Sequence, residues 1–353
     1  MKVIAFYLPQ FHRIKENDEW WGEGFTEWTN VKKSKALFDS HVQPKIPLNQ
    51  NYYNLLDRKV HEWQSEMLEK YNIYGLCYYH YWFNGKKLLE KPLELLLKNK
   101  DINTRFCMSW ANEPWTRSWD GKNKEILIGQ NYGGKLEWKE HFDYLLQFFN
   151  DKRYIKVDGK PVFVIYRTNN IENSEEMINY WEELAVENGL NGLYIVETLN
   201  SFQKQPCISS SKAIIEFEPM YTLRHDMPII RQGYRFLKKK TKSLDKFYYE
   251  EVYKRILSRN IKYEEKEKFS GAFVDWDNTP RKNERGTVCI GANPNSFKDN
   301  LEKLCNKCKR ENNDKFIFIN AWNEWAEGTY LEPDEKYKYG YLEAIKTTID
   351  KYK

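Results

Sequence analysis

Short apolar runs alternate with longer stretches of helical period along the whole chain of 353 residues. The apolar runs lie at residues 2–8, 73–82, 104–110, 161–166, 193–197, 213–217, 271–275 and 316–322. The longest amphipathic stretches between them are Leu55–Lys70, Glu137–Asn150, Ser174–Asn188 and Phe297–Glu311. This order predicts an α/β fold with eight strands, a single (β/α)8 TIM barrel with long loops that takes up residues 1–353.

The composition of the runs indicates a parallel sheet. PVFVIY at 161–166 and FIFIN at 316–320 are apolar at every position before the last. Parallel strands that are covered on both faces have this composition. A doubly wound open sheet would show similar runs, but neither a GxGxxG nor a P-loop sequence follows any of them. We therefore expect the sheet to close into a barrel.

Residues 222–265 depart from the repeating order, between the sixth and seventh predicted strands. They contain RFLKKKTKSLDK and then a Tyr- and Glu-rich segment of helical period. We predict that they form an inserted helical cap. The cluster Lys238–Lys242 is expected to be a solvated helix face, and the alternative is peripheral contact with an anionic headgroup or a phosphate-bearing glycan.

Charge and cysteine content narrow the possible partners. The net charge of +5 is spread along the chain and does not favour nucleic acid. The segment before Pro9 has too few apolar residues for a secretory core or a membrane span, so we expect a cytoplasmic protein without an integral membrane segment. The scattered cysteines are expected to be reduced thiols. Cys305 and Cys308 have the spacing of half a metal site without a second pair, so we predict no metal and no cofactor.

Two carboxylates follow the last predicted strand, in FIFINAWNEWAEGTYLEPD at 316–334. Glu324 and Glu327 are three residues apart, and at this spacing the Cβ atoms of a helical turn share one face, about 5–6 Å apart. Enzymes that act on glycosidic bonds commonly use two nearby carboxyl groups. We expect Trp322 and Trp325 to provide apolar walls that raise a carboxyl pKa by desolvation. The competing interpretation is two solvated charges on a surface loop.

Polar and aromatic residues follow most of the predicted strands, and enzymes with this fold carry their active site at that end of the barrel. Rings cover the C–H faces of a sugar while amides and carboxylates bind its hydroxyls, so the mixture suits a carbohydrate. For any single member, such as His80, a structural role is the competing interpretation. The candidate substrate-binding residues are Tyr7, His12, Trp28, His80, Tyr81, Trp82, Trp110, Asn112, Glu113, Trp115, Glu218, Tyr221, Trp276, Asp277, Asn278, Trp322 and Asn323.

Five segments in order carry a family resemblance. They are AFYLPQFH at 5–12, WWGEGFTEWTNV at 20–31, WANEPWTRSWDG at 110–121, DWDNTPR at 275–281 and NAWNEWAEGTYLEPD at 320–334. Together they resemble the WbsX-like proteins, a group named as glycosyltransferases of surface polysaccharide clusters and related to glycoside hydrolase family 99. The resemblance spans nearly the whole chain, and it implies a (β/α)8 barrel with its site near the eighth strand.

The same resemblance implies roles for the two glutamates. Family 99 contains endo-acting α-mannosidases and mannanases, and its two catalytic glutamates in an NEWxEG stretch correspond to Glu324 and Glu327. By this analogy Glu327 is the general acid/base that protonates the departing oxygen. Glu324 assists the substrate's own 2-hydroxyl to attack the anomeric carbon, which gives a 1,2-anhydro sugar and net retention. Glu113 is the rival acid/base, because its Asn-Glu-Pro sequence resembles the acid/base signature of a large clan of barrel glycosidases. In that clan the signature follows the fourth strand, whereas Glu113 follows the third predicted strand. We therefore assign it to substrate binding.

Three functional classes remain open. The first is a retaining glycoside hydrolase or transglycosidase that acts on an α-mannoside-type glycan. The second is a glycosyltransferase in bacterial surface polysaccharide biosynthesis, of O-antigen or capsule, and the third is a barrel that only binds glycan. Asp275-Trp276-Asp277 matches the DxD metal string of many nucleotide-sugar transferases, but it lies in the predicted seventh strand and its loop, so we give it little weight. The expected partner is an oligosaccharide or a lipid-linked glycan.

Overall fold

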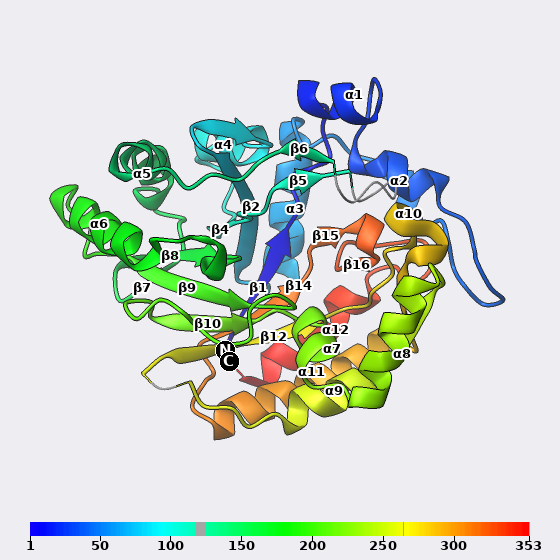
Figure 1. Ribbon diagram of the computed structural model, residues 1–353. Helices are drawn as coiled ribbons and strands as arrows, with labels where there is room; N and C mark the ends of the chain where they lie inside the picture. Colours follow the sequence, from blue (N-terminus) through cyan, green and yellow to red (C-terminus); the bar gives the residue numbers. More distant parts are fainter. Residues whose placement is uncertain (118–124, 264, 353) are drawn as a thin grey trace.

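A closed parallel sheet forms the centre of the computed structural model, which describes residues 1–117, 125–263 and 265–352 (Figure 1). Each barrel strand pairs in parallel with the next, and the first strand pairs with both the second and the last. The strands are β1 (Lys2–Tyr7), β2 (Gly75–Phe83), β4 (Phe106–Trp110), β8 (Lys160–Ile165), β9 (Tyr194–Leu199), β10 (Ala213–Glu216), β12 (Glu267–Phe273) and β14 (Phe316–Asn320). The predicted (β/α)8 barrel is confirmed, and an open sheet is excluded. Residues 118–121 of the third motif lie outside the described residues.

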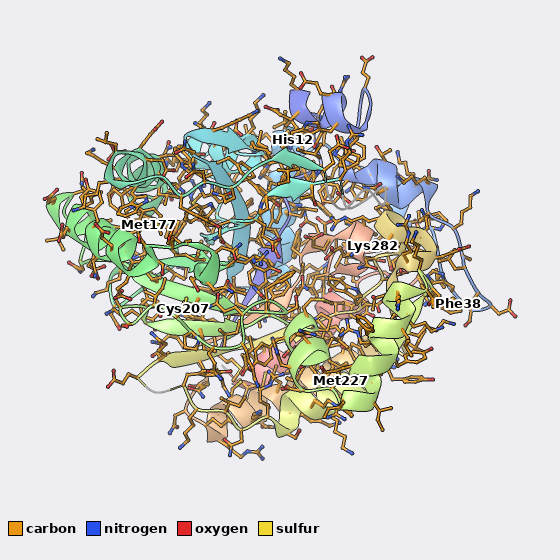
Figure 2. All side chains as sticks on the ribbon, in the orientation of Figure 1. His12, Phe38, Met177, Cys207, Met227 and Lys282 are labelled. Atoms are coloured by element: carbon orange, nitrogen blue, oxygen red, sulfur yellow. The ribbon has the colours of Figure 1, made fainter. Side chains whose placement is uncertain are left out.

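Helices surround this sheet, and side chains fill the space between the two layers (Figure 2). The predicted amphipathic stretches form α3 (Arg58–Lys70), α5 (Lys135–Phe149), α6 (Ser174–Glu187) and α11 (Pro294–Arg310). The other helices are α1 (Lys15–Trp21), α2 (Glu27–Lys33), α4 (Lys91–Lys98), α7 (Met220–His225), α8 (Ile229–Lys240), α9 (Tyr249–Ser258), α10 (Thr279–Lys282) and α12 (Gly340–Ile349). Short strands outside the barrel are β3 (Lys86–Leu88), β5 (Trp115–Thr116), β6 (Ile126–Ile128), β7 (Lys156–Val157), β11 (Asp245–Tyr248), β13 (Thr287–Ile290), β15 (Asn323–Glu324) and β16 (Thr329–Tyr330). None of the helices in the described ranges has both the length and the apolar composition needed to cross a bilayer.

The start of α11 illustrates how local sequence sets a helix boundary. The Asn293 side chain accepts hydrogen bonds from the backbone N–H groups of Asn295 and Ser296, which have no partner inside the helix. Pro294 occupies the first helical position, where its missing N–H costs nothing. Basic residues in the last turn complement the negative end of the helix dipole.

Successive side chains along a barrel strand point alternately into the barrel and toward the helices. Phe6 lies inside, with ring centroids 5.7 Å from Tyr79 and 5.6 Å from Phe318. The next residue, Tyr7, points outward and donates a 2.9 Å hydrogen bond to Gln64 of α3. This alternation decides which residues at the strand ends can face a common site.

The predicted helical insertion between the sixth and seventh barrel strands is present and also contains a strand. β11 pairs in parallel with β13, which follows β12 in the chain. Helix α9 packs Val252, Tyr253 and Ile256 inward, and the Tyr253 hydroxyl donates to the Phe273 carbonyl oxygen of β12 at 2.8 Å. Helix α8 lies at the edge of the molecule (Figure 1).

Candidate active site

One guanidinium group gathers the two predicted catalytic carboxylates. Arg281 Nη1 lies 2.6 Å from Glu327 Oε1, and Arg281 Nη2 lies 3.1 Å from Glu324 Oε2. Arg281 Nε donates to Glu27 Oε1 at 2.9 Å. We call Arg281, Glu27, Glu324 and Glu327 the Arg281 cluster. The two glutamates thus meet on one side of their turn, as their spacing predicts.

A tight turn after β14 places these glutamates beside α10. Gly328 ends the turn at φ +66°, where a Cβ atom would lie 2.8 Å from Asp277 Cβ and 2.9 Å from Lys45 Nζ. The Asp277 N–H donates to the Glu327 carbonyl oxygen at 2.6 Å, and Asp277 Oδ1 accepts from the Thr279 N–H at the start of α10. Since α10 carries Arg281, this close approach aligns the cation with both carboxylates.

The environment of Glu324 favours its neutral form. Its side chain is 8% exposed, whereas that of Glu327 is 24% exposed. Burial raises the pKa of Glu324 to about 8, the positive charge of Arg281 opposes this shift, and the negative charges of Glu327 and Glu27 add to it. The raised carboxyl pKa expected of a proton donor is therefore found at Glu324.

Three tyrosines from two strand ends lie within the electrostatic reach of the pair. Tyr79 and Tyr81 belong to β2, and Tyr166 directly follows β8. Burial raises the pKa of each phenol, and the charge of Glu324 raises all three further. They therefore remain hydroxyl donors at neutral pH. The sequence interpretation included Tyr81 but missed Tyr79 and Tyr166.

Glu113 also lies near the pair. It forms a 2.7 Å ion pair with Arg167, and burial, aided by the charge of Glu327, raises its carboxyl pKa. Asn112 holds the backbone of Arg167 by accepting from its N–H and donating to its carbonyl oxygen, both at 2.8 Å. Asn112 is therefore positioned to support Arg167 and, through it, Glu113.

An aromatic wall adjoins Tyr81. The ring of Trp115 packs edge-on against Tyr81, with centroids 5.2 Å apart, and against Trp20 at 5.6 Å. Trp20 and Trp115 are both partly exposed. Tyr81 and Trp115 therefore remain candidate substrate-binding rings, and Trp20 becomes a third candidate.

Three other predicted sugar contacts point away from the barrel axis, so the structure gives no support to their role in substrate binding. His80 and His141 of α5 share a hydrogen bond of 2.8 Å, and Trp82 stacks on His141 with centroids 4.5 Å apart. Trp110 donates to the Trp82 carbonyl oxygen. Burial lowers the pKa of His80 to about 3. These rings fill the layer between the barrel and α5 because they alternate with the inward-facing residues.

The tryptophans that flank Glu324 are also core residues, not pocket walls. Trp322 and Trp325 are 0% and 1% exposed, and their indole N–H groups donate to Glu332 at 2.8 and 2.7 Å. Asn323 bonds the backbone N–H and carbonyl oxygen of Leu8. Tyr7, bonded to α3, is outside the site as well. The motif residues other than the glutamates thus hold the turn in place.

Glu218 and Tyr221 belong to a separate buried ion cluster. Arg259 bonds Glu218 at 2.9 Å and Glu216 at 2.7 Å, and its guanidinium lies 4.5 Å from the Tyr221 ring centroid. The structure gives no support to their predicted role in substrate binding, because Glu218 bonds Arg259 and Thr222, and the Tyr221 hydroxyl lies 3.4 Å from the Tyr263 hydroxyl.

The two aspartates of the DxD string are bonded to other side chains of the protein. Lys45 pairs with Asp275 at 2.8 Å, and His41 lies 2.8 Å from Asp277. The Asn278 side-chain oxygen accepts from the Thr287 N–H, whereas the buried indole N–H of Trp276 has no hydrogen-bond partner among the described residues. Over the described ranges, no group of three or more His, Cys, Asp or Glu side chains is arranged to hold a metal ion.

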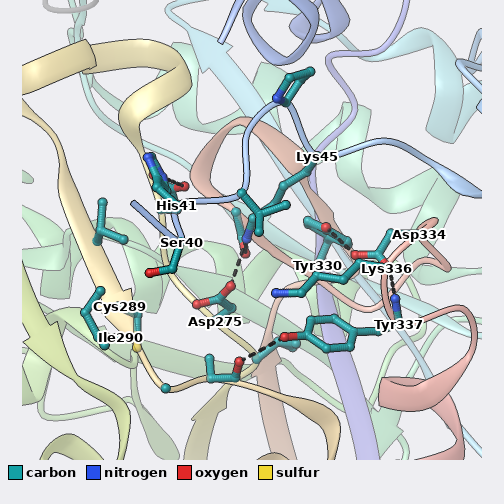
Figure 3. A pocket seen from close by; sticks show the side chains of 18 of the residues that line it. Ser40, His41, Lys45, Asp275, Cys289, Ile290, Tyr330, Asp334, Lys336 and Tyr337 are labelled. Atoms are coloured by element: carbon teal, nitrogen blue, oxygen red, sulfur yellow. Dashed lines mark hydrogen bonds and ion pairs between the residues drawn. The ribbon is translucent and has the colours of Figure 1, made fainter. Parts of the chain in front are cut away.

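Two cavities flank the site. The one in Figure 3 has a volume of about 410 Å³, is lined by Lys45, Asp275 and Tyr330, and touches the turn after β14 at Gly328. The second, of about 650 Å³, is lined by His12 and Trp28 among others. Burial lowers the pKa of His12 to about 4, and the Trp28 indole donates to the Tyr53 carbonyl oxygen. His12 and Trp28 therefore line a hollow whose walls include neither Glu324 nor Glu327.

Residues 3–345 match the family described as Glycosyltransferase WbsX. The chain belongs to this family. It is 31% identical over 349 residues to the uncharacterized protein WxcX of Xanthomonas campestris pv. campestris (strain B100), a match that covers 98% of this chain and 49% of WxcX. The WxcX protein of strain ATCC 33913 is 30% identical over the same length and coverage. The chain thus spans about half the length of these curated relatives.

Solved structures share the fold at low identity. The GH99 endo-alpha-mannosidase from Bacteroides thetaiotaomicron superposes with a TM-score of 0.60 at 15% identity, over 99% of this chain and 97% of that one. A glycoside hydrolase-like protein gives a TM-score of 0.60 at 15% identity, over 98% and 93% of the two chains. The likeness supports the (β/α)8 barrel assignment.

Proposed function

We propose that this enzyme acts on glycosidic bonds at Glu324 and Glu327, by retaining cleavage or transglycosylation of an α-mannoside-type glycan. The observation that carries the proposal is the Arg281 cluster, in which a buried cation fixes two carboxylates at the carboxyl end of the last barrel strand. The end of the barrel where strands lead into loops is the place where such folds carry their chemistry.

In the proposed reaction one of the two glutamates acts as the general acid and the other as the general base. By the family resemblance, Glu327 protonates the leaving oxygen and Glu324 assists the 2-hydroxyl of the substrate. The raised pKa of Glu324, about 8, supports the reverse assignment in the unliganded enzyme, because a group that holds its proton at neutral pH can donate it. A substrate with an activated leaving group decides between them, since it restores turnover only in the variant that lacks the donor.

The second candidate function is glycosyl transfer in bacterial surface polysaccharide biosynthesis. The description of the matching family favours it. The fold and the paired glutamates suit either outcome, because the same glycosyl intermediate can be captured by water or by a sugar hydroxyl. The acceptor therefore distinguishes the two candidates.

Product analysis tests both. The wild-type protein and its Glu324→Gln and Glu327→Gln variants are incubated with α-mannoside oligosaccharides and with lipid-linked glycans, and products are followed by mass spectrometry. Released fragments support hydrolysis, and a mass gain on an acceptor supports transfer. Glycan binding without turnover, unchanged in both variants, would instead support a binding barrel and contradict the proposal. Glu66→Gln, on the exposed surface of α3, is the matched control.

A further inference from the structure

Helix α8 presents an apolar surface to solvent. Ile229 and Ile230 are 87% and 88% exposed, Phe236 is 68% exposed, Leu237 58% and Tyr234 47%. At 100° per residue these five side chains fall on one side of the helix, which we call the apolar face of α8. Single exposed apolar side chains are ordinary, but a contiguous set is typical of an interaction surface.

The polar side of α8 is the side that faces the protein. Arg231 pairs with Asp245 Oδ1 at 2.7 Å, and Arg235 Nε pairs with Asp245 Oδ2 at 3.0 Å. Gln232 donates to the Met227 carbonyl oxygen at 2.9 Å. An ordinary surface helix has the opposite orientation, with its apolar side on the core. Ion pairs to β11 therefore hold α8 with its apolar face outward.

The surroundings of this face are strongly basic. Residues 227–248 contain one acidic residue, Asp245, which the two arginines already pair. The basic residues of the same stretch are Arg231, Arg235, Lys238, Lys239, Lys240, Lys242 and Lys246. Lys240, Lys242 and Lys246 are exposed. Exposed apolar residues bordered by lysines are the composition of helices that lie in the interface of anionic membranes.

We propose that α8 is a peripheral membrane anchor whose apolar face enters the interface of an anionic lipid bilayer. Lys240 at its end and the nearby exposed Lys242 and Lys246 lie at the level of the headgroups, where each contributes an electrostatic attraction that falls with salt. The anchor connects to the active site, because β11 pairs with β13 and the Asp245 N–H donates to the Gly286 carbonyl oxygen just after α10. Membrane attachment would hold Arg281 and its glutamates near lipid-borne glycans, but the anchor does not depend on the proposed reaction.

Vesicle flotation tests the anchor directly. The whole chain is mixed with vesicles of phosphatidylcholine alone or of phosphatidylcholine with phosphatidylglycerol, at low and high salt. We expect binding to the anionic vesicles, at least about tenfold stronger than to the neutral ones at low salt and weakened by high salt. No binding to anionic vesicles overturns the proposal.

Paired variants distinguish binding through the apolar face of α8 from non-specific binding of exposed apolar side chains to vesicles. Ile230→Gln with Phe236→Gln changes two exposed positions, so the fold is expected to persist, and vesicle binding is expected to fall by at least about tenfold. Leu136→Gln with Val186→Gln is the matched control, since these side chains are 89% and 62% exposed on other helices, and its binding is expected to equal that of the wild type. Equal loss in both pairs, or none in the first, contradicts the anchor. The anchor is also contradicted if sedimentation shows that the wild type is a dimer and that the Ile230→Gln, Phe236→Gln variant is a monomer. The apolar face of α8 would then join two copies of the chain.

Discussion

Replacing Glu324 with glutamine isolates the energetic cost of the buried carboxyl group. Burial raises the pKa of Glu324 to about 8 from an ordinary value of 4.5. Between these two values the native state holds a proton that the unfolded chain has lost, so the wild-type free energy of unfolding falls as pH rises, by about 1.36 kcal/mol per pH unit from this group. Glutamine has no proton to lose. From pH 5.5 to pH 7.5 the variant should therefore gain about 3 kcal/mol relative to the wild type.

Urea denaturation at the two pH values measures this difference. The free energy of unfolding of each protein is obtained by linear extrapolation from the tryptophan fluorescence transition. Glu66→Gln, on an exposed surface, is expected to follow the wild type at both pH values. If Glu324→Gln and the wild type show the same dependence on pH, the carboxyl group is already ionised in the folded protein at pH 5.5 and the electrostatic description of the site is wrong. If Glu324→Gln loses turnover but is more stable than the wild type at pH 7.5, the loss of activity is not caused by unfolding.

Three further substitutions test how the site is held. Arg281→Gln leaves the carboxylates of Glu27 and Glu327 without their cation, so we expect a loss of about 3–5 kcal/mol in urea denaturation, and an unchanged stability would show that Arg281 does not hold the cluster. Gly328→Ala forces a side chain into a left-handed conformation and against Asp277, so we expect a loss of about 1–3 kcal/mol and reduced turnover, whereas full activity would contradict the tight turn. The Glu332 side chain accepts hydrogen bonds from four donors, and in Glu332→Gln the amide NH2 group would face some of those donors. We therefore expect the Tm to fall by several degrees, whereas a rise in Tm would argue against an ionised Glu332.

The barrel was predictable because its signal is local and repeated. Each of the eight apolar runs coincides with a barrel strand, and the largest displacement of a strand start is at β12, which begins at Glu267 whereas the prediction begins at 271. The stretch EKFS at 267–270 is polar at three of four positions, so it does not extend the apolar run that marks the strand. Pairing with β10 and β14, which the local sequence does not encode, places those residues in the sheet.

Side-chain direction was harder to predict than strand position. In YYHYW at 78–82 every residue is aromatic, so composition does not distinguish the inward face from the outward one. Alternation from Phe6, which stacks on Tyr79 inside the barrel, assigns Tyr79 and Tyr81 to the site and His80 and Trp82 to the helix layer. Applied to the sequence with one known inward residue, the same alternation would have found Tyr79.

The Arg281 cluster shows why paired charges escape sequence reasoning. Glu27 and Arg281 each lie in a motif that carries the family resemblance, yet 254 residues separate them. Nothing local to either motif identifies the other as its partner. Trp322 and Trp325 were misassigned although they lie close to Glu324 in the sequence. A tryptophan next to a glutamate gives the same sequence pattern whether its ring lines a pocket or lies in the core, where here Glu332 accepts its indole N–H.

The turnover of the two glutamine variants tests the central claim most directly. With a glycan that the wild type cleaves or extends, Glu324→Gln and Glu327→Gln are each expected to lower the rate by about 10²–10⁴, while Glu66→Gln retains it. Wild-type rates in both active-site variants would show that the carboxylates held by Arg281 do not perform the chemistry.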